Sequence, residues 1–337
     1  MARINLLPWR EWERERKRKE FLTNLAGVLI AGLVAPLLFG NTESGQTTVV
    51  DNPPCPALPS GKDVFLEPEL RVLSVNLAHG RKDGLNQALQ SGETARRNVQ
   101  EAAELLRELD ADVIALQEAD APSRWSGSFD HVEAVANVAG YDCRFHGVHA
   151  TGRWYNFGTA LLSRYRFTRA AQHDFIPTPP TTRKGFVATQ IQWNPAGVLE
   201  SPIDLTLVSL HLDFSRRSSR ESQFAEMTEV LAEFPRPLVL MGDFNTEWDS
   251  KGALLQAFAA TLDLQAWAPE SDDYGTYKDG SKRLDWILVS KDLGFAGYRV
   301  LEEVVSDHQP VWAQLRLLDV NPEANSAAAQ VSSNHAD

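Results

Sequence analysis

The chain has 337 residues, of which 43% are hydrophobic and 23% are charged. This length and composition fit one large α/β domain with appendages and exclude a chain that is disordered throughout. The net charge of −12 is uneven, because residues 1–20 hold seven Lys or Arg against four Glu and the remaining residues therefore carry −15. With this negative charge, residues 21–337 repel bulk nucleic acid and anionic lipid, which favours a small substrate. Phosphate chemistry is not excluded, since a bound divalent cation inverts the charge locally.

Residues 21–40 form an uncharged apolar run behind the basic segment 1–20, which also contains Trp9 and Trp12. Twenty residues rise about 30 Å as an α-helix, the thickness of a bilayer core. A buried core helix and a long signal peptide are the alternatives, although Leu38-Phe39-Gly40 fits a small-x-small cleavage site poorly. We therefore predict an uncleaved transmembrane anchor. The basic residues before it predict that the amino terminus stays in the cytoplasm and that the rest is exported.

The segments that flank the main domain differ from it in composition. Residues 41–64 contain Asn, Thr, Ser, Gly and four prolines, which predicts an extended linker. Residues 319–337 are rich in Ala, Ser and Asn, which predicts a disordered tail. The two cysteines, Cys55 and Cys143, lack the spacing of a zinc or redox motif. They are either unrelated thiols or, in an oxidising compartment, a single bridge between the linker and the domain.

Between these ends, residues 65–318 alternate between short strand-like runs and helical ones. Apolar or β-branched runs bounded by turn residues predict strands over 70–76, 112–117, 158–163, 186–193, 204–211, 237–242, 284–290 and 310–317. Apolar residues at helical spacing predict helices over 94–109 and 219–233. Many strands with few helices predict an α/β domain of two packed sheets with helices on the outer faces.

Polar residues recur where several of the predicted strands begin or end. They are Asn76, Glu118, His211, Asp243 with Asn245, Asp285, and Asp307 with His308. Side chains at strand ends of a layered α/β fold line a common crevice. Taken singly, each of these residues is more often a turn or cap residue than a catalytic one. Their joint occurrence on successive strands predicts a site.

Three of these residues are candidate metal ligands. Glu118, Asp307 and Asn76 offer hard oxygen donors, which suit Mg²⁺ or Mn²⁺ rather than zinc.

The other residues suit proton transfer and phosphate binding. Asp243 is predicted to hold and deprotonate a water, while Asn245 orients it or donates to the developing charge. His211 and His308 are predicted to donate to phosphate oxygens. Asp285 is predicted to accept from His308 and keep that imidazole protonated.

The order of these residues resembles the endonuclease/exonuclease/phosphatase superfamily, which includes pancreatic-type deoxyribonucleases, apurinic endonucleases, bacterial sphingomyelinases and inositol polyphosphate 5-phosphatases. The resemblance covers residues 68–317. Its motifs are Val72-Leu73-Ser74-Val75-Asn76, Ile114-Ala115-Leu116-Gln117-Glu118, Gly158-Thr159-Ala160-Leu161-Leu162-Ser163-Arg164, Ser209-Leu210-His211-Leu212, Gly242-Asp243-Phe244-Asn245, Arg283-Leu284-Asp285-Trp286-Ile287 and Ser306-Asp307-His308. It implies a four-layer α/β/β/α sandwich of two mixed sheets, a Mg²⁺-type cofactor and the roles given above.

The substrate is less well determined, because the family accepts many phosphoesters. Arg220 and Gln223 match the family's helix after His211, which implies substrate binding, although both also suit a solvated helix face. His79 resembles a feature of one subgroup, and Asn156 precedes the Gly158 motif; both are candidate substrate ligands, and His79 is equally well explained as a loop residue. The loops expected to select substrate hold Trp125, His149, Arg153, Trp154, Tyr155, Arg183 and Lys184. This mix suits a base, a sugar or a lipid headgroup, although aromatic residues beside a cleft more often pack than bind.

The amino terminus resembles a second family. Met1-Ala-Arg-Ile-Asn-Leu-Leu-Pro-Trp-Arg10, followed by a charged run and one span, is similar to the start of the type IV pilus inner-membrane assembly protein PilN. The resemblance implies that residues 1–10 dock onto a cytoplasmic actin-like pilus protein. That family's coiled coil and periplasmic domain are absent from the sequence. The match is either a real fusion or a gene-boundary artefact.

Together these features predict a bacterial, single-pass inner-membrane protein with a monomeric periplasmic domain that hydrolyses phosphoesters, or a secreted one if the anchor is cleaved. The leading substrate is a phosphodiester of a nucleic acid or a lipid headgroup, and the acidic body favours a small or lipid substrate over long duplex DNA. The alternatives are a phosphomonoesterase and a non-catalytic pilus-assembly or binding module on the same fold.

Overall fold

The computed structural model describes residues 45–318, apart from residues 54, 56–61, 83, 85–89 and 304. The predicted anchor at 21–40 and the predicted tail at 319–337 lie outside this part of the chain. Within the described residues, no helix is both long enough and apolar enough to cross a membrane.

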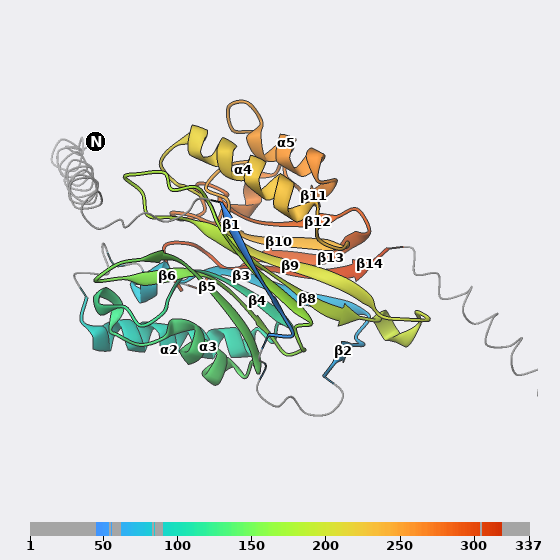
Figure 1. Ribbon diagram of the computed structural model, residues 1–337, viewed down its shortest axis with the longest axis horizontal. Helices are drawn as coiled ribbons and strands as arrows, with labels where there is room; N and C mark the ends of the chain where they lie inside the picture. The colour runs from blue at the N-terminus through green and yellow to red at the C-terminus, as the bar shows by residue number, and fades with distance from the viewer. Residues whose placement is uncertain are drawn as a thin grey trace, which may run out of the picture.

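Two mixed β-sheets form the centre of the domain (Figure 1). In the described residues the larger sheet runs in the order β1 (Gln46–Asp51), β7 (Arg169–Asp174), β8 (Gly185–Trp193), β9 (Ile203–His211), β10 (Leu238–Asp243), β12 (Asp285–Ser290) and β11 (Leu264–Ala266), with β2 (Val64–Phe65) beside β8. The smaller sheet runs in the order β13 (Leu293–Val300), β14 (Val311–Leu317), β3 (Glu69–Asn76), β4 (Val113–Asp120), β6 (Asn156–Ser163) and β5 (Cys143–Thr151). Pairs β9/β10, β2/β8 and β3/β4 are parallel and the rest antiparallel, so both sheets are mixed.

Helices cover the outer faces of the two sheets, so the domain is an α/β sandwich as predicted. Helices α2 (Gly92–Glu108) and α3 (His131–Ala139) lie against the smaller sheet, and α4 (Arg217–Leu231) and α5 (Leu254–Thr261) against the larger (Figure 1). Helix α2 begins at Ser91, whose side chain accepts from the Thr94 backbone N–H. Short 3₁₀ turns lie at Ala78–Gly80, Arg124–Ser126, Pro195–Gly197 and Asp272–Tyr274.

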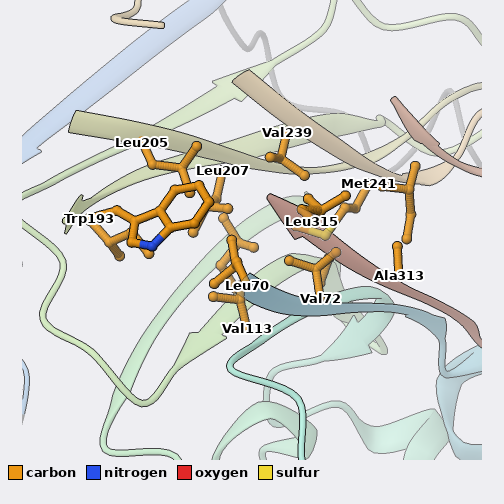
Figure 2. Close-up of a cluster of buried hydrophobic side chains, with 14 of the residues drawn as sticks. Leu70, Val72, Val113, Trp193, Leu205, Leu207, Val239, Met241, Ala313 and Leu315 are labelled. Atoms are coloured by element: carbon orange, nitrogen blue, oxygen red, sulfur yellow. The ribbon is translucent and has the colours of Figure 1, made fainter. Parts of the chain in front are cut away.

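The central strands are apolar on both faces because each contributes to two cores. In β4, Val113 and Ala115 pack between the sheets, whereas Ile114 and Leu116 pack under the α2/α3 layer. In β10 the residues at alternate positions likewise pack between the sheets or under α4 and α5. Figure 2 shows side chains of the two sheets meeting in the inter-sheet core, from β3 and β14 on one side and β9 and β10 on the other. Strands buried on both faces read as continuous apolar runs, which is how they were predicted.

The structure confirms all eight predicted strands and both predicted helices, with ends shifted by a few residues. The prediction for the linker was wrong in part, because residues 46–51 form strand β1, which pairs with β7 at the edge of the larger sheet. Cys55 is disulfide-bonded to Cys143 at the start of β5. Of the two alternatives for the cysteines, the structure therefore has the bridge, and β1 and Cys55 are attached to the domain.

The strand register brings the predicted site residues together. His211, Asp243 and Asp285 are direct neighbours across β9, β10 and β12. Behind them, the buried Gln117 side chain donates to Ser209 Oγ, and Ser209 Oγ donates to the Leu116 carbonyl. These bonds cross between the sheets and fix the end of β4 against the end of β9. The last residues of β3 and β4 therefore face the last residues of β9 and β10.

Candidate active site

A cleft of about 520 Å³ lies at this shared end of the two sheets. Its lining includes Arg81, Glu118, His211, Phe214, Arg220, Asp243, Asn245, Thr246, Glu247, Tyr277, Lys282, Asp307 and His308. Of the eight residues predicted to be catalytic or metal-binding, six line the cleft directly, while Asn76 and Asp285 lie beneath its lining and contact Asp243 and His308 respectively.

Asp243 lies at the buried end of β10. The preceding residue is Gly242, where a Cβ atom would meet the Leu210 carbonyl oxygen at 2.1 Å, so only glycine lets β10 approach β9 this closely. Asp243 Oδ1 accepts from the Asn245 backbone N–H at 2.9 Å, and Oδ2 accepts from the Asn76 amide at 3.3 Å. Asn245 has a positive φ of 51° and donates its side-chain amide to the Leu212 carbonyl. These contacts fix the orientation of the Asp243 carboxylate.

Asp285 and His308 form the predicted hydrogen bond. His308 Nδ1 lies 2.8 Å from Asp285 Oδ2, which also accepts from the Thr276 hydroxyl at 2.6 Å. The other ring nitrogen, Nε2, lies 3.9 Å from Asp243 Oδ2. The Ser306 hydroxyl accepts from the His308 backbone N–H and so fixes the turn before the imidazole. Three buried ionisable groups, Asp243, Asp285 and His308, thus form one cluster.

The charges in this cluster are strongly coupled. Burial raises the pKa of Asp243 to about 7; the charge on His308 opposes this, while Asp285 and Glu118 add to it. Burial alone would lower the pKa of His308, but Asp285 and Asp243 raise it well above its usual value. An aspartate that titrates near neutrality beside a protonated imidazole suits general acid–base work.

Glu118 projects into the cleft from an irregularity in β4. The β4/β6 register shifts between Leu116 and Ala119, and Glu118 has a positive φ of 47°. A bulge of this kind redirects a side chain, and backbone strain of this kind clusters at functional sites. The ring nitrogens nearest to its carboxylate are His79 Nε2 at 3.5 Å and His211 Nε2 at 3.8 Å. Burial alone would raise the pKa of Glu118, but the surrounding cations hold it well below its usual value.

Lys184, at the residue before β8, is buried behind His211. Its Nζ atom lies 3.2 Å from both ring nitrogens of His211. Burial and the charge on Lys184 lower the pKa of His211 well below its usual value, so this imidazole is neutral at pH 7. A neutral imidazole next to a lysine and 3.5 Å from Asp243 Oδ2 suits hydrogen bonding to a phosphate oxygen.

The three predicted metal ligands occupy different surroundings. Both carboxylate oxygens of Asp307 accept from Arg81 Nη2, at 2.9 and 2.8 Å. The Asn76 amide oxygen accepts from the Ala78 backbone N–H, and its amino group donates to Asp243. The Glu118 carboxylate has no hydrogen bond among the described residues. The set fits a hard divalent cation, because two carboxylates, Glu118 and Asp307, line one cleft, and the low pKa of Glu118 keeps that carboxylate anionic.

The predicted substrate ligands are only partly brought to the cleft. Arg220 lines it and donates to the Asp213 carbonyl. His79 is buried behind Glu118, where its Nδ1 atom lies 2.7 Å from Asp120. Gln223 lies outside the cleft lining, where it is buried and accepts from the Asp213 backbone N–H. Asn156 donates to the Pro122 carbonyl and lies outside the cleft lining.

Several functional candidates were missed from the sequence. Arg81, Tyr277 and Lys282 line the cleft from loops, and Thr276 supports Asp285 from beneath. Arg81 reaches Asp307 across 226 residues of sequence, which no local pattern indicates. Arg81 carried one signal, its position in the same loop as His79.

Comparisons with known proteins agree with this geometry. A sequence model described as the Endonuclease/Exonuclease/phosphatase family matches residues 73–308. An endonuclease/exonuclease/phosphatase family protein from Leptotrichia buccalis has 20% identity and a TM-score of 0.57, covering 74% of this chain and 100% of that chain. The mannosyl-6-phosphatase of Bacteroides thetaiotaomicron has 19% identity and a TM-score of 0.53, covering 73% of this chain and 99% of that chain. At these identities the structural likeness establishes the fold alone.

A separate similarity agrees with the resemblance of the amino terminus. The type IV pilus inner membrane component PilN of Pseudomonas aeruginosa is 39% identical over 77 residues. The match covers 23% of this chain and 34% of that protein, so the chain spans about a third of the length of this relative.

Proposed function

Because the chain belongs to the endonuclease/exonuclease/phosphatase family, we propose that it is a metal-dependent phosphoesterase whose preferred substrate is a phosphodiester. One observation carries this proposal: Asp243, with a pKa near 7, lies beside the hydrogen-bonded pair of His308 and Asp285 in an open cleft. That arrangement supplies a base for water and a cationic donor for phosphate oxygens.

The proposed reaction uses these groups in order. Asp243 takes a proton from a water held by Asn245, and the water oxygen forms a bond to phosphorus. The ester P–O bond breaks on the opposite side, and the departing alkoxide takes up a proton from solvent, to which Asp243 later returns the proton that it removed. His308 and the neutral His211 donate hydrogen bonds to the phosphate oxygens as negative charge accumulates on them. Asp285, fixed by Thr276, keeps His308 oriented and protonated.

A divalent cation, Mg²⁺ or Mn²⁺, would be held by Glu118 and Asp307, with Asn76 behind them. When bound, such an ion supplies positive charge to the phosphate and lowers the barrier to its negatively charged transition state. Asp307 is bound to Arg81 in this structure, so Glu118 offers the carboxylate that is ready to accept an ion. Mg²⁺ commonly uses only one or two carboxylates, with waters and substrate phosphate completing its shell.

The acidic surface favours a small or lipid-linked phosphodiester over long duplex DNA. A phosphomonoester is the second candidate, and the mannosyl-6-phosphatase among the structural relatives favours it. A non-catalytic pilus-assembly module is less well supported, because every predicted catalytic residue is present at the cleft or in contact with it. The decisive assay presents the purified protein, with Mg²⁺ or Mn²⁺, with plasmid DNA, RNA, sphingomyelin, phosphatidylinositol phosphates and bis-p-nitrophenyl phosphate. If the protein hydrolyses none of these substrates, the proposal is overturned.

We also propose that residues 21–40 anchor the protein in the bacterial inner membrane with the catalytic domain in the periplasm. The basic residues before the apolar run support this orientation, and the Cys55–Cys143 bridge supports an oxidising compartment. Alkaline phosphatase fused after residue 64 is expected to be active and to remain in the membrane fraction. Recovery in the soluble periplasm would mean that residues 1–40 are a cleaved signal. Cytosolic recovery would make a gene-boundary artefact the better explanation of the amino terminus.

A further inference from the structure

Three large apolar side chains are exposed on loops at the cleft end of the sheets, Ile176 and two aromatic ones. Trp154, in the loop between β5 and β6, is 50% exposed, and Phe214, just after β9, is 58% exposed. Phe214 also lines the cleft. Single exposed apolar side chains are common on soluble domains, but Trp is enriched at the boundary between water and lipid, and Phe occurs on the apolar face of segments that bind there.

Both aromatic side chains are accompanied by exposed arginines. The guanidinium carbon of Arg153 lies 5.4 Å from the Trp154 ring, and that of Arg124 lies 5.6 Å from it. Arg216 follows Phe214 and donates to the carbonyls of Thr178 and Pro179, which fixes its loop. We call Arg124, Arg153, Trp154, Phe214 and Arg216 the aromatic rim. The one acidic residue of its three loops, 121–127, 151–156 and 212–216, is the buried Asp213.

The two parts of the rim are connected by packed side chains. The Trp125 backbone N–H donates to the Trp154 carbonyl, and the Trp125 ring stacks on Phe157 with centroids 5.5 Å apart. Lys184 Nζ lies 5.8 Å from the Phe157 ring and 3.2 Å from His211, three residues before Phe214. These contacts connect the loop of Trp154, on the smaller sheet, with the end of β9, on the larger one, beneath the surface.

The loop before β12, which reaches the cleft through Tyr277 and Lys282, has the other sign of charge. Residues 270–282 expose more carboxylates than lysines: Glu270, Asp272, Asp273 and Asp279 against Lys278 and Lys282. A nucleic-acid strand that crosses the cleft would meet this acidic loop, whereas a flat bilayer touches only the side that presents the rim. Basic side chains pair with phosphate headgroups, while the aromatic side chains beside them insert towards the acyl chains.

We propose that the aromatic rim docks on the headgroup layer of a phospholipid bilayer and presents the cleft to a phosphoester of a membrane lipid. The substrate class rests on the proposed hydrolytic function, while the docking itself does not. The rim gives an otherwise acidic domain one face that an anionic surface attracts.

The docking is tested with the full chain in nanodiscs of phosphatidylcholine and phosphatidylglycerol that contain 5-doxyl phosphatidylcholine. The doxyl group quenches tryptophans at the headgroup boundary, and the difference between the wild type and Trp154→Phe isolates Trp154. We expect more quenching in the wild type than in Trp154→Phe. The double variant Trp154→Phe/Leu66→Trp is the matched control, because Leu66 is 53% exposed at the other end of the sheets. Equal quenching in wild type and Trp154→Phe, or strong quenching from position 66, would overturn the docking.

The substrate class is tested with Trp154→Ser, whose side chain lies outside the cleft lining. We expect hydrolysis of a phospholipid in vesicles to fall about tenfold, because docking is weakened, and hydrolysis of soluble bis-p-nitrophenyl phosphate to stay within about twofold. Leu66→Ser is expected to change neither rate. The lipid assignment would be overturned if Trp154→Ser lost the same activity on both substrates. It would also be overturned if this variant bound oligo(dT) more weakly while its hydrolysis of vesicle lipid stayed unchanged. No hydrolysis by the wild type of any ester would instead overturn the proposed function, and the quenching result would still decide the docking.

Discussion

The two halves of the cleft position their carboxylates by different means. Asp285 and Asp243 are held by hydrogen bonds of 2.6 to 3.3 Å from Thr276, His308, Asn245 and Asn76. Glu118 is instead surrounded by cations whose closest nitrogen is 3.5 Å away. A carboxylate with its lone pairs occupied has a fixed orientation and suits proton transfer, whereas one balanced only by charge keeps its oxygens available to a ligand. This difference indicates that the hydrogen-bonded half, with Asp243 and Asp285, acts in proton transfer and that the half with Glu118 binds a cation.

The largest expected effect concerns the Glu118 half. Removal of divalent ions with EDTA should abolish hydrolysis, and Glu118→Gln should reduce it by at least about a hundredfold, because an amide is a weaker ligand for a hard cation. Glu247→Gln is the matched control, since Glu247 lines the same cleft outside this cluster of cations. Titration with Mn²⁺ measures the change in apparent affinity. Full activity in excess EDTA would remove the proposed distinction between the two halves.

The next effect concerns the hydrogen-bonded half. Asp243→Asn and His308→Ala should each lower kcat by about 10²–10⁴, since both act in the transition state. The KM for bis-p-nitrophenyl phosphate should change much less than kcat. Circular dichroism and the melting temperature serve as controls for folding. A rise in KM with kcat unchanged would assign these residues to binding and contradict the comparison.

A smaller effect should separate cooperation within the hydrogen-bonded half from independent action. Asp285→Asn should reduce kcat less than His308→Ala, and adding it to His308→Ala should cost little more, because the two residues act through one hydrogen bond. The double-mutant cycle on kcat measures the coupling. Losses that simply add would mean that Asp285 and His308 work separately.

Much of the fold could be predicted because its central strands are buried on both faces. Residues 113–116 and 238–242 are uninterrupted apolar or small residues, followed by Gln117-Glu118 and by Asp243, so both the strand and the site residue are visible in the sequence. Strand β1 could not be predicted in this way. Residues 46–51 are almost fully exposed at a sheet edge, so they carry no alternation of apolar and polar residues. Cross-strand pairing with β7 determines their structure.

The residues of the site likewise differ in whether the sequence predicts them. Asp243 ends β10 and Asp285 begins β12, while Glu118 lies near the end of β4 and His308 shortly before β14. Their position along the chain therefore predicts their position in space. The Arg81–Asp307 pair and the Thr276–Asp285 contact depend on how loops fold over the strand ends. Gln223 was predicted from its match to the family's helix after His211, which gives the residue's place along α4 but not which side chain reaches the cleft. Its amide instead holds the Asp213 loop.

The smallest expected effect tests whether the support beneath the hydrogen-bonded half matters. The buried Thr276 hydroxyl donates to Asp285 and accepts from the backbone N–H groups of Leu284 and Asp285, both at 3.1 Å. Thr276→Val keeps the shape but removes these bonds, so the free energy of unfolding should fall by about 1–3 kcal/mol. We expect kcat to fall by only about 2- to 10-fold, since the His308–Asp285 bond itself remains.

The matched control for this prediction is Thr276→Ser, which keeps the hydroxyl and loses a methyl group. It should retain nearly wild-type kcat, while chemical denaturation reports any loss of stability from the missing methyl. If Thr276→Ser lowers kcat as far as Thr276→Val, packing of the methyl group positions Asp285 and the hydroxyl does not. If neither variant changes kcat, the orientation of His308 depends on Asp285 and the Ser306 turn alone. Thr276 would then not contribute to catalysis, and the contrast with Glu118 would rest on His308, Asp285 and Asp243.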